Sequence, residues 1–361
     1  MARVIHVGLL ERGFRSEVLT SGTTISDRLV RRLGRTPVGF LAKSWLGATL
    51  AMEFKVLHVH HGESLLLLLL LRLRRRRPRI LMMFHVDVRR REAANGHHLV
   101  AGRRFGPGGI RRLKHGIGEV VKPLLDRAGW VLADAVTVET ERLVEELSDL
   151  RPRREIEMVP YGIGKAGENA GVKSDPVELL YVGTPGNRKR THLLPMILRR
   201  VRERVPNARL RIVGFNQNAD PQLADEGERL DVLSAVEFLG PMTAEEVVPF
   251  YRTANVLILP SAYEGLPMVL LEAMREGLVA VATNVSGHPE AIEHGVNGIL
   301  VPVDDVDAMA DKCAALLLDP DSAARMGEAA LQTVATRFHI DRQLDSYAQL
   351  YERLSRRRTL D

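Results

Sequence analysis

Short runs of apolar residues recur along the whole chain and alternate with longer stretches of helical periodicity. In the first half the predicted strands are Val4–Val7, Val56–Val59, Ile80–Phe84, Ala135–Val138 and Ile156–Val159. In the second half they are Leu179–Val182, Leu210–Val213, Val236–Leu239, Val256–Leu259, Val279–Ala282 and Ile299–Val301. Runs this short and mostly apolar are typical of parallel strands whose two faces are both covered by helices. Because the alternation occurs in both halves, we predict two doubly wound, Rossmann-like α/β domains.

The stretches between the strands predict helices and the boundary between the domains. Helical periodicity covers Arg190–Arg204 and Asp305–Leu318, and it continues from Asp319 to the end of the chain. Asp305 and Asp319 each precede a helical stretch, so we predict that they cap helices and do not bind metal. The glycine-rich segment Tyr161–Gly171 has no periodicity and is predicted to be a linker. We therefore expect one domain over residues 1–165, with a C-terminal helix at about 339–361 packing back on it, and a second over 168–338.

Composition narrows the class of protein. The chain has 361 residues, of which 45% are hydrophobic and 27% charged, as is typical of a soluble globular enzyme. Its single cysteine, Cys313, excludes a disulfide framework and a cysteine-built zinc site. The sequence starts without the apolar stretch of a signal peptide, and its longest aliphatic run, Leu65–Leu71, is far shorter than the roughly 20 residues of a spanning helix. We expect a cytoplasmic protein.

Charge is divided unevenly between the halves. Residues 1–165 contain 30 Lys and Arg against 17 Asp and Glu, a net charge of +13, whereas the remainder contains 21 against 28, a net charge of −7. The basic half suits anionic lipid at the inner membrane face, a phosphorylated acceptor or nucleic acid, and it is equally consistent with a plain solvated surface. Aromatic residues are only 5% and none interrupts the arginines of residues 72–79, which argues against nucleic acid. We interpret Leu65–Leu71 and these arginines as a crossover helix with a basic end, in preference to a membrane-docking segment.

The segment that follows the strand Val256–Leu259 carries the clearest chemistry. It reads Glu264-Gly-Leu-Pro267 and continues into a predicted helix, with Pro267 at the first helical position and Gly277 just after the end. A helix that begins at the carboxyl end of a parallel strand presents free amides and a dipole that favour an anion such as phosphate. Glu272, in the second turn, is suited to accept hydrogen bonds from sugar hydroxyls, as in ribose recognition.

The segment Glu264–Glu272 resembles the retaining glycosyltransferases of family 4, the glycosyl transferases group 1, whose paired glutamates are separated by seven residues. Other matching motifs follow the family in order and spacing: Tyr181–Gly183, Val213–Gly214, Val236–Gly240, Ser286–Glu290 and Gly295–Val301. The resemblance is dense over residues 175–335 and thinner in the first half. It implies the GT-B fold, which is an α/β architecture of two facing Rossmann-like domains with a cleft between them.

The same resemblance implies roles for individual residues. Glu272 would bind the nucleotide ribose, Glu264 would lie near the donor sugar, and Lys189 would neutralise the diphosphate. His85 would lie near the donor sugar and, with Gly13, near the acceptor, which makes His85, Lys189 and Glu264 the expected catalytic residues. The remaining donor-binding residues would be Gly183, Thr184, Arg188, Gly214, Gly265, Leu266, Pro267, Met268 and Val269. The family usually has arginine where this chain has Thr184, so Arg188 or Arg190 would supply the missing cation.

We therefore predict a retaining, metal-independent bacterial hexosyltransferase. It would move a sugar from a nucleoside-diphosphate sugar, with a UDP-sugar favoured, to a hydroxyl of a glycan, glycolipid or natural product. The nucleotide sugar is a substrate, and no cofactor or metal is expected. Two alternatives stay open: a nucleotide-sugar 2-epimerase of the same fold, and a catalytically degenerate binding protein. A glycoside hydrolase is a contrasting class, because it would need two facing carboxylates, one as the acid and one as the nucleophile or base.

Overall fold

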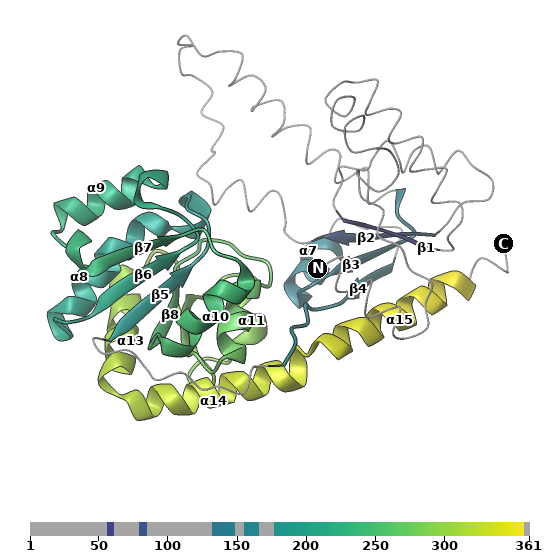
Figure 1. Cartoon of the computed structure of the whole chain (residues 1–361). Coiled ribbons are helices and arrows are strands. Elements are labelled where there is room, and N and C mark those ends of the chain that lie inside the picture. The colour runs from purple at the N-terminus through teal and green to yellow at the C-terminus, as the bar shows by residue number, and fades with distance from the viewer. Residues whose placement is uncertain (1–55, 61–78, 85–131, 149–154, 166–176, 357–361) are drawn as a thin grey trace, which may run out of the picture. The chain divides into compact units, whose positions relative to one another are not determined.

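The computed structural model describes residues 56–60, 79–84, 132–148, 155–165 and 177–356 (Figure 1). These residues fall into two compact units. The first unit contains residues 56–60, 79–84, 132–148 and 155–159 together with 341–356. Among the described residues, the second unit contains 160–165 and 177–340.

In the first unit, the described residues form a parallel four-stranded sheet. Its strands lie in chain order: β1 (Val56–His60), β2 (Arg79–Phe84), β3 (Ala135–Val138) and β4 (Glu155–Met158). Helix α7 (Glu141–Ser148) connects β3 to β4, and the Thr140 hydroxyl caps it by accepting a hydrogen bond from the Leu143 amide at 3.2 Å. The four predicted strands of this part are confirmed, and the predicted strand at residues 4–7 lies outside the described residues.

The last helix, α15 (Ile340–Arg356), belongs to the first unit from residue 341 onward. Its apolar positions follow the predicted helical spacing, and Tyr347 and Leu350 are fully buried. Near its end, Arg353 forms an ion pair with Glu157 of β4. The helix is therefore attached to this sheet by both apolar packing and charge.

The second unit is built on a parallel sheet of six strands. They are β5 (Glu178–Val182), β6 (Arg209–Val213), β7 (Val236–Gly240), β8 (Val256–Leu259), β9 (Ala280–Thr283) and β10 (Ile299–Val301). Their spatial order is β10-β9-β8-β5-β6-β7, so β5 and β8 are neighbours although two strands separate them in sequence. The chain order reverses between β5 and β8, and ligands of open α/β sheets bind at the carboxyl ends of the strands at such a point. All six strands predicted for this half are confirmed.

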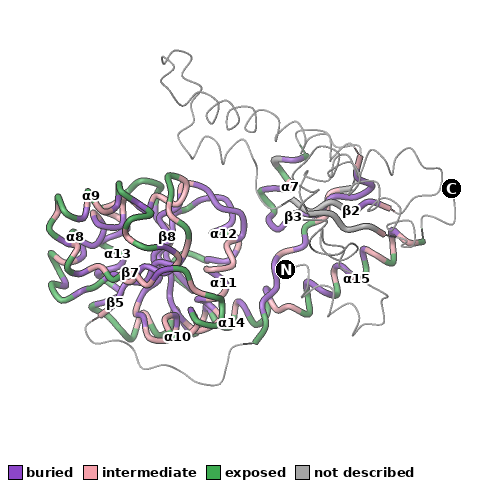
Figure 2. Tube along the Cα trace, turned by 45° about the horizontal axis from the view of Figure 1, so that its top comes forward, coloured by how far each residue is buried: buried purple, intermediate pink, exposed green. Residues whose placement is uncertain are grey.

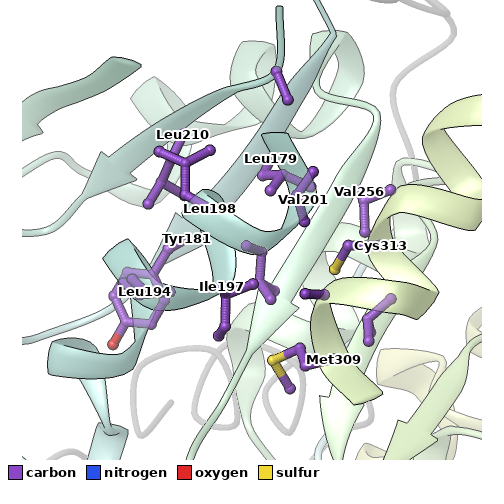
Figure 3. Close-up of a cluster of buried hydrophobic side chains, with 14 of the residues drawn as sticks. Leu179, Tyr181, Leu194, Ile197, Leu198, Val201, Leu210, Val256, Met309 and Cys313 are labelled. Atoms are coloured by element: carbon purple, nitrogen blue, oxygen red, sulfur yellow. The ribbon is translucent and has the colours of Figure 1, made fainter. Parts of the chain in front are cut away.

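Helices cover the sheet of the second unit. Helices α8 (Leu194–Arg204) and α13 (Val306–Leu318) pack together over one face, where their apolar side chains meet those of the strands (Figure 3). Alternate strand residues such as Leu180 and Leu257 point to the opposite face and are also fully buried. The other helices are α9 (Pro221–Arg229), α10 (Ala244–Thr253), α11 (Met268–Arg275), α12 (His288–Ala291) and α14 (Pro320–Arg337). Figure 2 shows the buried strands enclosed by helices whose outer sides are exposed.

Both predicted aspartate caps are present. Asp305 accepts a hydrogen bond from the Ala308 amide at 2.9 Å, and Asp319 accepts one from the Ser322 amide at 3.0 Å. The stretch predicted as one helix from Arg190 begins differently, with two short 3₁₀ turns before α8 starts at Leu194. The reason is that Arg190 has a left-handed backbone, with φ of 53°, which an α-helix cannot contain.

The glycine-rich segment predicted as a linker starts in an ordered way. Its first residues, Tyr161–Ile163, are buried, and Ile163 exchanges backbone hydrogen bonds of 2.8 and 3.0 Å with Phe338 and Ile340. A Cβ atom at Gly162 would lie 2.6 Å from the Cα of Ile340, so only glycine allows these two chain segments to approach so closely. The first and last described segments of the second unit are therefore bonded to each other.

Candidate active site

Two loops meet at the point where the strand order reverses. We call residues 183–193, which follow β5, the cation loop, and residues 260–267, which follow β8, the glutamate loop. Because β5 and β8 are adjacent parallel strands, both loops emerge at the same edge of the sheet. The Ala262 amide donates to the Arg188 carbonyl at 2.8 Å, and the Arg188 guanidinium donates to the Tyr263 carbonyl at 3.0 Å. The loops thus form one hydrogen-bonded unit.

Glu264 lies between two cations of the cation loop. Its Oε2 is 2.8 Å from Nη1 of Arg188, and its Oε1 is 2.6 Å from Nζ of Lys189. The Glu264 side chain is only 7% exposed, so these are largely desolvated ion pairs. Burial alone would raise the pKa of Glu264, but the charges of Lys189 and Arg188 hold it below the ordinary value. Three of the residues predicted for the donor site therefore converge, with Glu264 ionised.

The amino end of α11 directly follows these ion pairs. The helix starts at Met268, one residue later than predicted, because Pro267 has an extended backbone with ψ of 124° and occupies the N-cap position. No side chain caps this end, and the first helical amides have no intrahelical acceptor. Gly265 and Leu266 are buried, whereas Pro267, Met268 and Val269 are partly exposed. The predicted anion-favouring helix start thus follows shortly after Glu264, the ion-pair partner of Lys189 and Arg188, in the chain.

The loop after β9 packs against the backbone of the glutamate loop. A Cβ atom at Gly287 would lie 1.8 Å from the carbonyl oxygen of Gly265, so the two backbones are in direct contact. A matching contact occurs after β5 and β6, where a Cβ atom at Gly214 would lie 2.1 Å from the carbonyl oxygen of Gly183. Gly214 also has φ of 116°, which only glycine adopts readily. These glycines allow the loop backbones at the edge of the sheet to touch.

Arg188 and Arg190, the two candidates to replace the arginine that the family usually has at position 184, bind different partners. Arg188 faces Glu264, as described above, whereas the Arg190 guanidinium binds both carboxylate oxygens of Asp304, at 2.7 and 3.2 Å. Thr184 is exposed, and its carbonyl accepts a hydrogen bond from the Tyr181 hydroxyl at 3.1 Å. Arg188 is therefore the arginine that the fold places beside Glu264 and Lys189.

The second glutamate, Glu272, lies in the second turn of α11, as predicted, and is half-buried. Its Oε2 accepts a hydrogen bond of 2.9 Å from the hydroxyl of Tyr251 on α10. Sequence reasoning missed Tyr251 because its spacing from Val247 is that of an ordinary apolar helix face. Only the packing of α10 against α11 shows its contact with a predicted site residue.

His288 is a second residue that the sequence did not single out, although it lies within the quoted motif Ser286–Glu290. It is fully buried, and its Nδ1 is 2.7 Å from the Thr283 carbonyl, so this nitrogen carries the proton. Burial lowers the pKa of His288, which keeps the ring neutral. Its Nε2 has no hydrogen-bond partner in the described part of the chain. The sequence signal that could have identified this residue is a histidine within the motif Ser286–Glu290, between Gly287 and Pro289.

Some expectations fall beyond this site. His85 and Gly13 lie outside the described residues. Over the described ranges, no group of three His, Cys, Asp or Glu side chains is arranged to hold a metal ion. None of the helices in those ranges is both long enough and apolar enough to cross a membrane.

Comparison with known proteins identifies the family of the second unit. Residues 165–333 match the family model described as Glycosyl transferases group 1. These residues form a group 1 glycosyl transferase domain. A D-inositol 3-phosphate glycosyltransferase from Corynebacterium urealyticum is 30% identical over 243 residues, which are 62% of this chain and 57% of the relative. A glycogen synthase from Mycobacterium tuberculosis is 32% identical over 179 residues, covering 50% of this chain and 43% of the relative.

Solved structures extend the likeness beyond the group 1 domain. A sucrose-phosphate synthase from Thermosynechococcus elongatus superposes with a TM-score of 0.75 at 19% identity, covering 98% of this chain and 92% of that one. HepE from Anabaena superposes with a TM-score of 0.66 at 17% identity, covering 88% and 84%. These neighbours and the two parallel sheets confirm the predicted fold class, α/β of the GT-B type. The chain spans about half the length of the curated relatives it matches.

Proposed function

We propose that this chain is a retaining glycosyltransferase that moves a hexosyl group from a nucleoside-diphosphate sugar, with a UDP-sugar favoured, to an acceptor hydroxyl. The observation that carries the proposal is the convergence of Arg188 and Lys189 on Glu264, beside the uncapped start of α11. Two partly buried cations and a helix dipole would supply the fixed positive potential that a departing diphosphate needs. Relatives named as glycosyltransferases and a HepE structure in complex with UDP-glucose support this chemistry.

Glu264 would exchange partners when the donor binds. The diphosphate would take over the cations of Lys189 and Arg188, since both already lie within ion-pair distance of a carboxylate. Glu264 would then be free to accept hydrogen bonds from the hydroxyls of the donor sugar. Charge on the diphosphate grows as its bond to the sugar breaks, so Lys189 and Arg188 would stabilise the transition state more than the bound substrate.

Retention would follow from attack on the same face of the sugar from which the diphosphate leaves. The bond between the anomeric carbon and the phosphate oxygen breaks, the bond to the acceptor oxygen forms, and the leaving phosphate takes the acceptor proton. This route needs no protein side chain as a covalent nucleophile, and the cations of the cation loop take the role that a metal would otherwise have. We therefore propose metal-independent transfer without a cofactor.

The acceptor would bind through the first half of the chain, where Gly13 and His85 are the candidate contacts. A hydroxyl of a glycan, glycolipid or natural product fits this proposal. The net charge of +13 on residues 1–165 also suits docking on an anionic inner membrane face, with the protein residing in the cytoplasm.

Thermal-shift measurements with UDP, GDP, ADP and dTDP test the proposal and identify the base. A nucleotide at 100 times its dissociation constant should stabilise the protein by about 2.7 kcal/mol. Incubation with the matching nucleotide sugar in the absence of acceptor should then release free sugar with retained anomeric configuration. Conversion to an epimer would favour the epimerase, and binding without any turnover would favour a degenerate binding protein. Failure of every nucleotide to bind would refute the proposal.

A further inference from the structure

Tyr251 holds one oxygen of the Glu272 carboxylate and leaves the other free. The tyrosine side chain is fully buried on α10, and its hydroxyl is 2.9 Å from Oε2 of Glu272 on α11. Among the described residues, Oε1 of Glu272 has no hydrogen-bond or ion-pair partner. Since Glu272 is only half-buried, Oε1 is available to a ligand on the exposed side of the helix.

The direction of this hydrogen bond is determined by the two groups. A carboxylate only accepts, so the phenol donates. Burial raises the pKa of Tyr251, and the adjacent charge of Glu272 raises it further, so the hydroxyl keeps its proton. A buried phenol has few rotamers, and its hydrogen bond therefore restricts the carboxylate to one orientation.

A second polar contact fixes the same two helices without touching Glu272. Arg252, the next residue on α10, donates at 2.8 Å to Glu276, the residue that caps the carboxyl end of α11. Glu276 is also paired with Arg275 at 2.8 Å, and its side chain is 2% exposed. The Arg252 contact therefore fixes the helix register, whereas the Tyr251 contact adds the orientation of a site carboxylate.

We propose that Tyr251 is the positioning residue for ribose recognition, because it holds Glu272 so that Oε1 accepts a hydrogen bond from a ribose hydroxyl. This inference rests on the proposed function, in which Glu272 faces the donor nucleotide. Its consequence is specificity: the Tyr251–Glu272 pair sets the preference for ribonucleotides over nucleotides that lack the ribose hydroxyls. Tyr251 acts only through Glu272 and makes no contact with the reacting atoms.

Calorimetry with UDP and 2′,3′-dideoxy-UDP tests the inference. The wild type should prefer UDP by about tenfold or more, and Glu272→Ala should abolish this preference. Tyr251→Phe should weaken UDP binding about threefold to tenfold and leave dideoxy-UDP binding unchanged, because only the oriented hydrogen bond is lost. In Tyr251→Phe the preference for UDP over dideoxy-UDP should therefore decrease only because the affinity for UDP decreases.

Arg252→Gln is the matched control, since it removes the neighbouring contact between α10 and α11. It should lower the melting temperature and keep the full preference for UDP. If Tyr251→Phe also keeps the full preference, the phenol has only a structural role and the inference is overturned, while the proposed function stands. A wild type that binds UDP and dideoxy-UDP equally would overturn the assignment of Glu272 to ribose. A wild type that binds no nucleotide would instead refute the proposed function.

Discussion

Glu139 should make the stability of the first unit depend strongly on pH. The residue directly follows β3, is 1% exposed, and neither of its carboxylate oxygens has a hydrogen-bond partner among the described residues. Burial raises the pKa of Glu139 from 4.5 to about 8, against a smaller lowering effect of its own backbone. The folded protein therefore keeps a proton on Glu139 that the unfolded chain releases near pH 4.5.

The size of the effect follows from linkage. Between pH 4.5 and about 8 the folded state binds more protons than the unfolded state, so the free energy of unfolding falls as pH rises. At about 1.4 kcal/mol per pKa unit, the shift amounts to a loss on the order of 5 kcal/mol, complete above pH 8. Glu139→Gln keeps the shape without the ionisation. The variant should match the wild type below pH 4.5 and exceed its stability increasingly up to pH 8.

Urea unfolding followed by tryptophan emission is the appropriate assay. Both tryptophans of the chain, Trp45 and Trp130, lie in the same half of the sequence as Glu139, which makes their emission the probe for this half. Glu145→Gln, at an exposed position of α7, is the control and should show no pH-dependent difference from the wild type. A constant difference between Glu139→Gln and the wild type across pH 4.5–8.5 would refute the reasoning, because it would mean that Glu139 titrates alike in both states.

Two further predictions concern the candidate active site. Lys189→Ala should lower kcat with the proposed donor by about tenfold or more and weaken donor binding less, because the charge of Lys189 matters most as the leaving group forms. If Lys189→Ala keeps full turnover and Arg188→Ala loses turnover, the role belongs to Arg188. Gly287→Ala should destabilise the second unit by about 2 kcal/mol or more and weaken nucleotide binding, because its Cβ would meet a carbonyl oxygen of the glutamate loop at 1.8 Å. Gly164→Ala, whose Cβ would meet nothing within 4 Å, should leave both the melting temperature and the nucleotide affinity unchanged.

Local features of the sequence were sufficient to predict most elements of the described fold. Four- and five-residue apolar runs marked the strands because buried parallel strands are apolar on both faces. Asp305 and Asp319 marked two helix starts, since a carboxylate at the N-cap bonds an amide three residues later. The predicted start of α8 was wrong because Arg190 has a left-handed backbone, which the apolar periodicity of residues 190–204 does not reveal.

The sequence by itself determined the alternation of strands and helices, the charge division and the motif Glu264–Glu272 that indicates the family. Only the tertiary structure decided which residues meet. Arg188 and Lys189 lie beside Glu264 because β5 and β8 pair across the reversal of strand order, although about 75 residues separate the two loops in sequence. Tyr251 reaches Glu272 only through the packing of α10 on α11. The physical reason is that hydrogen bonds and ion pairs depend on distances of about 3 Å, and sequence spacing defines such distances only within one element.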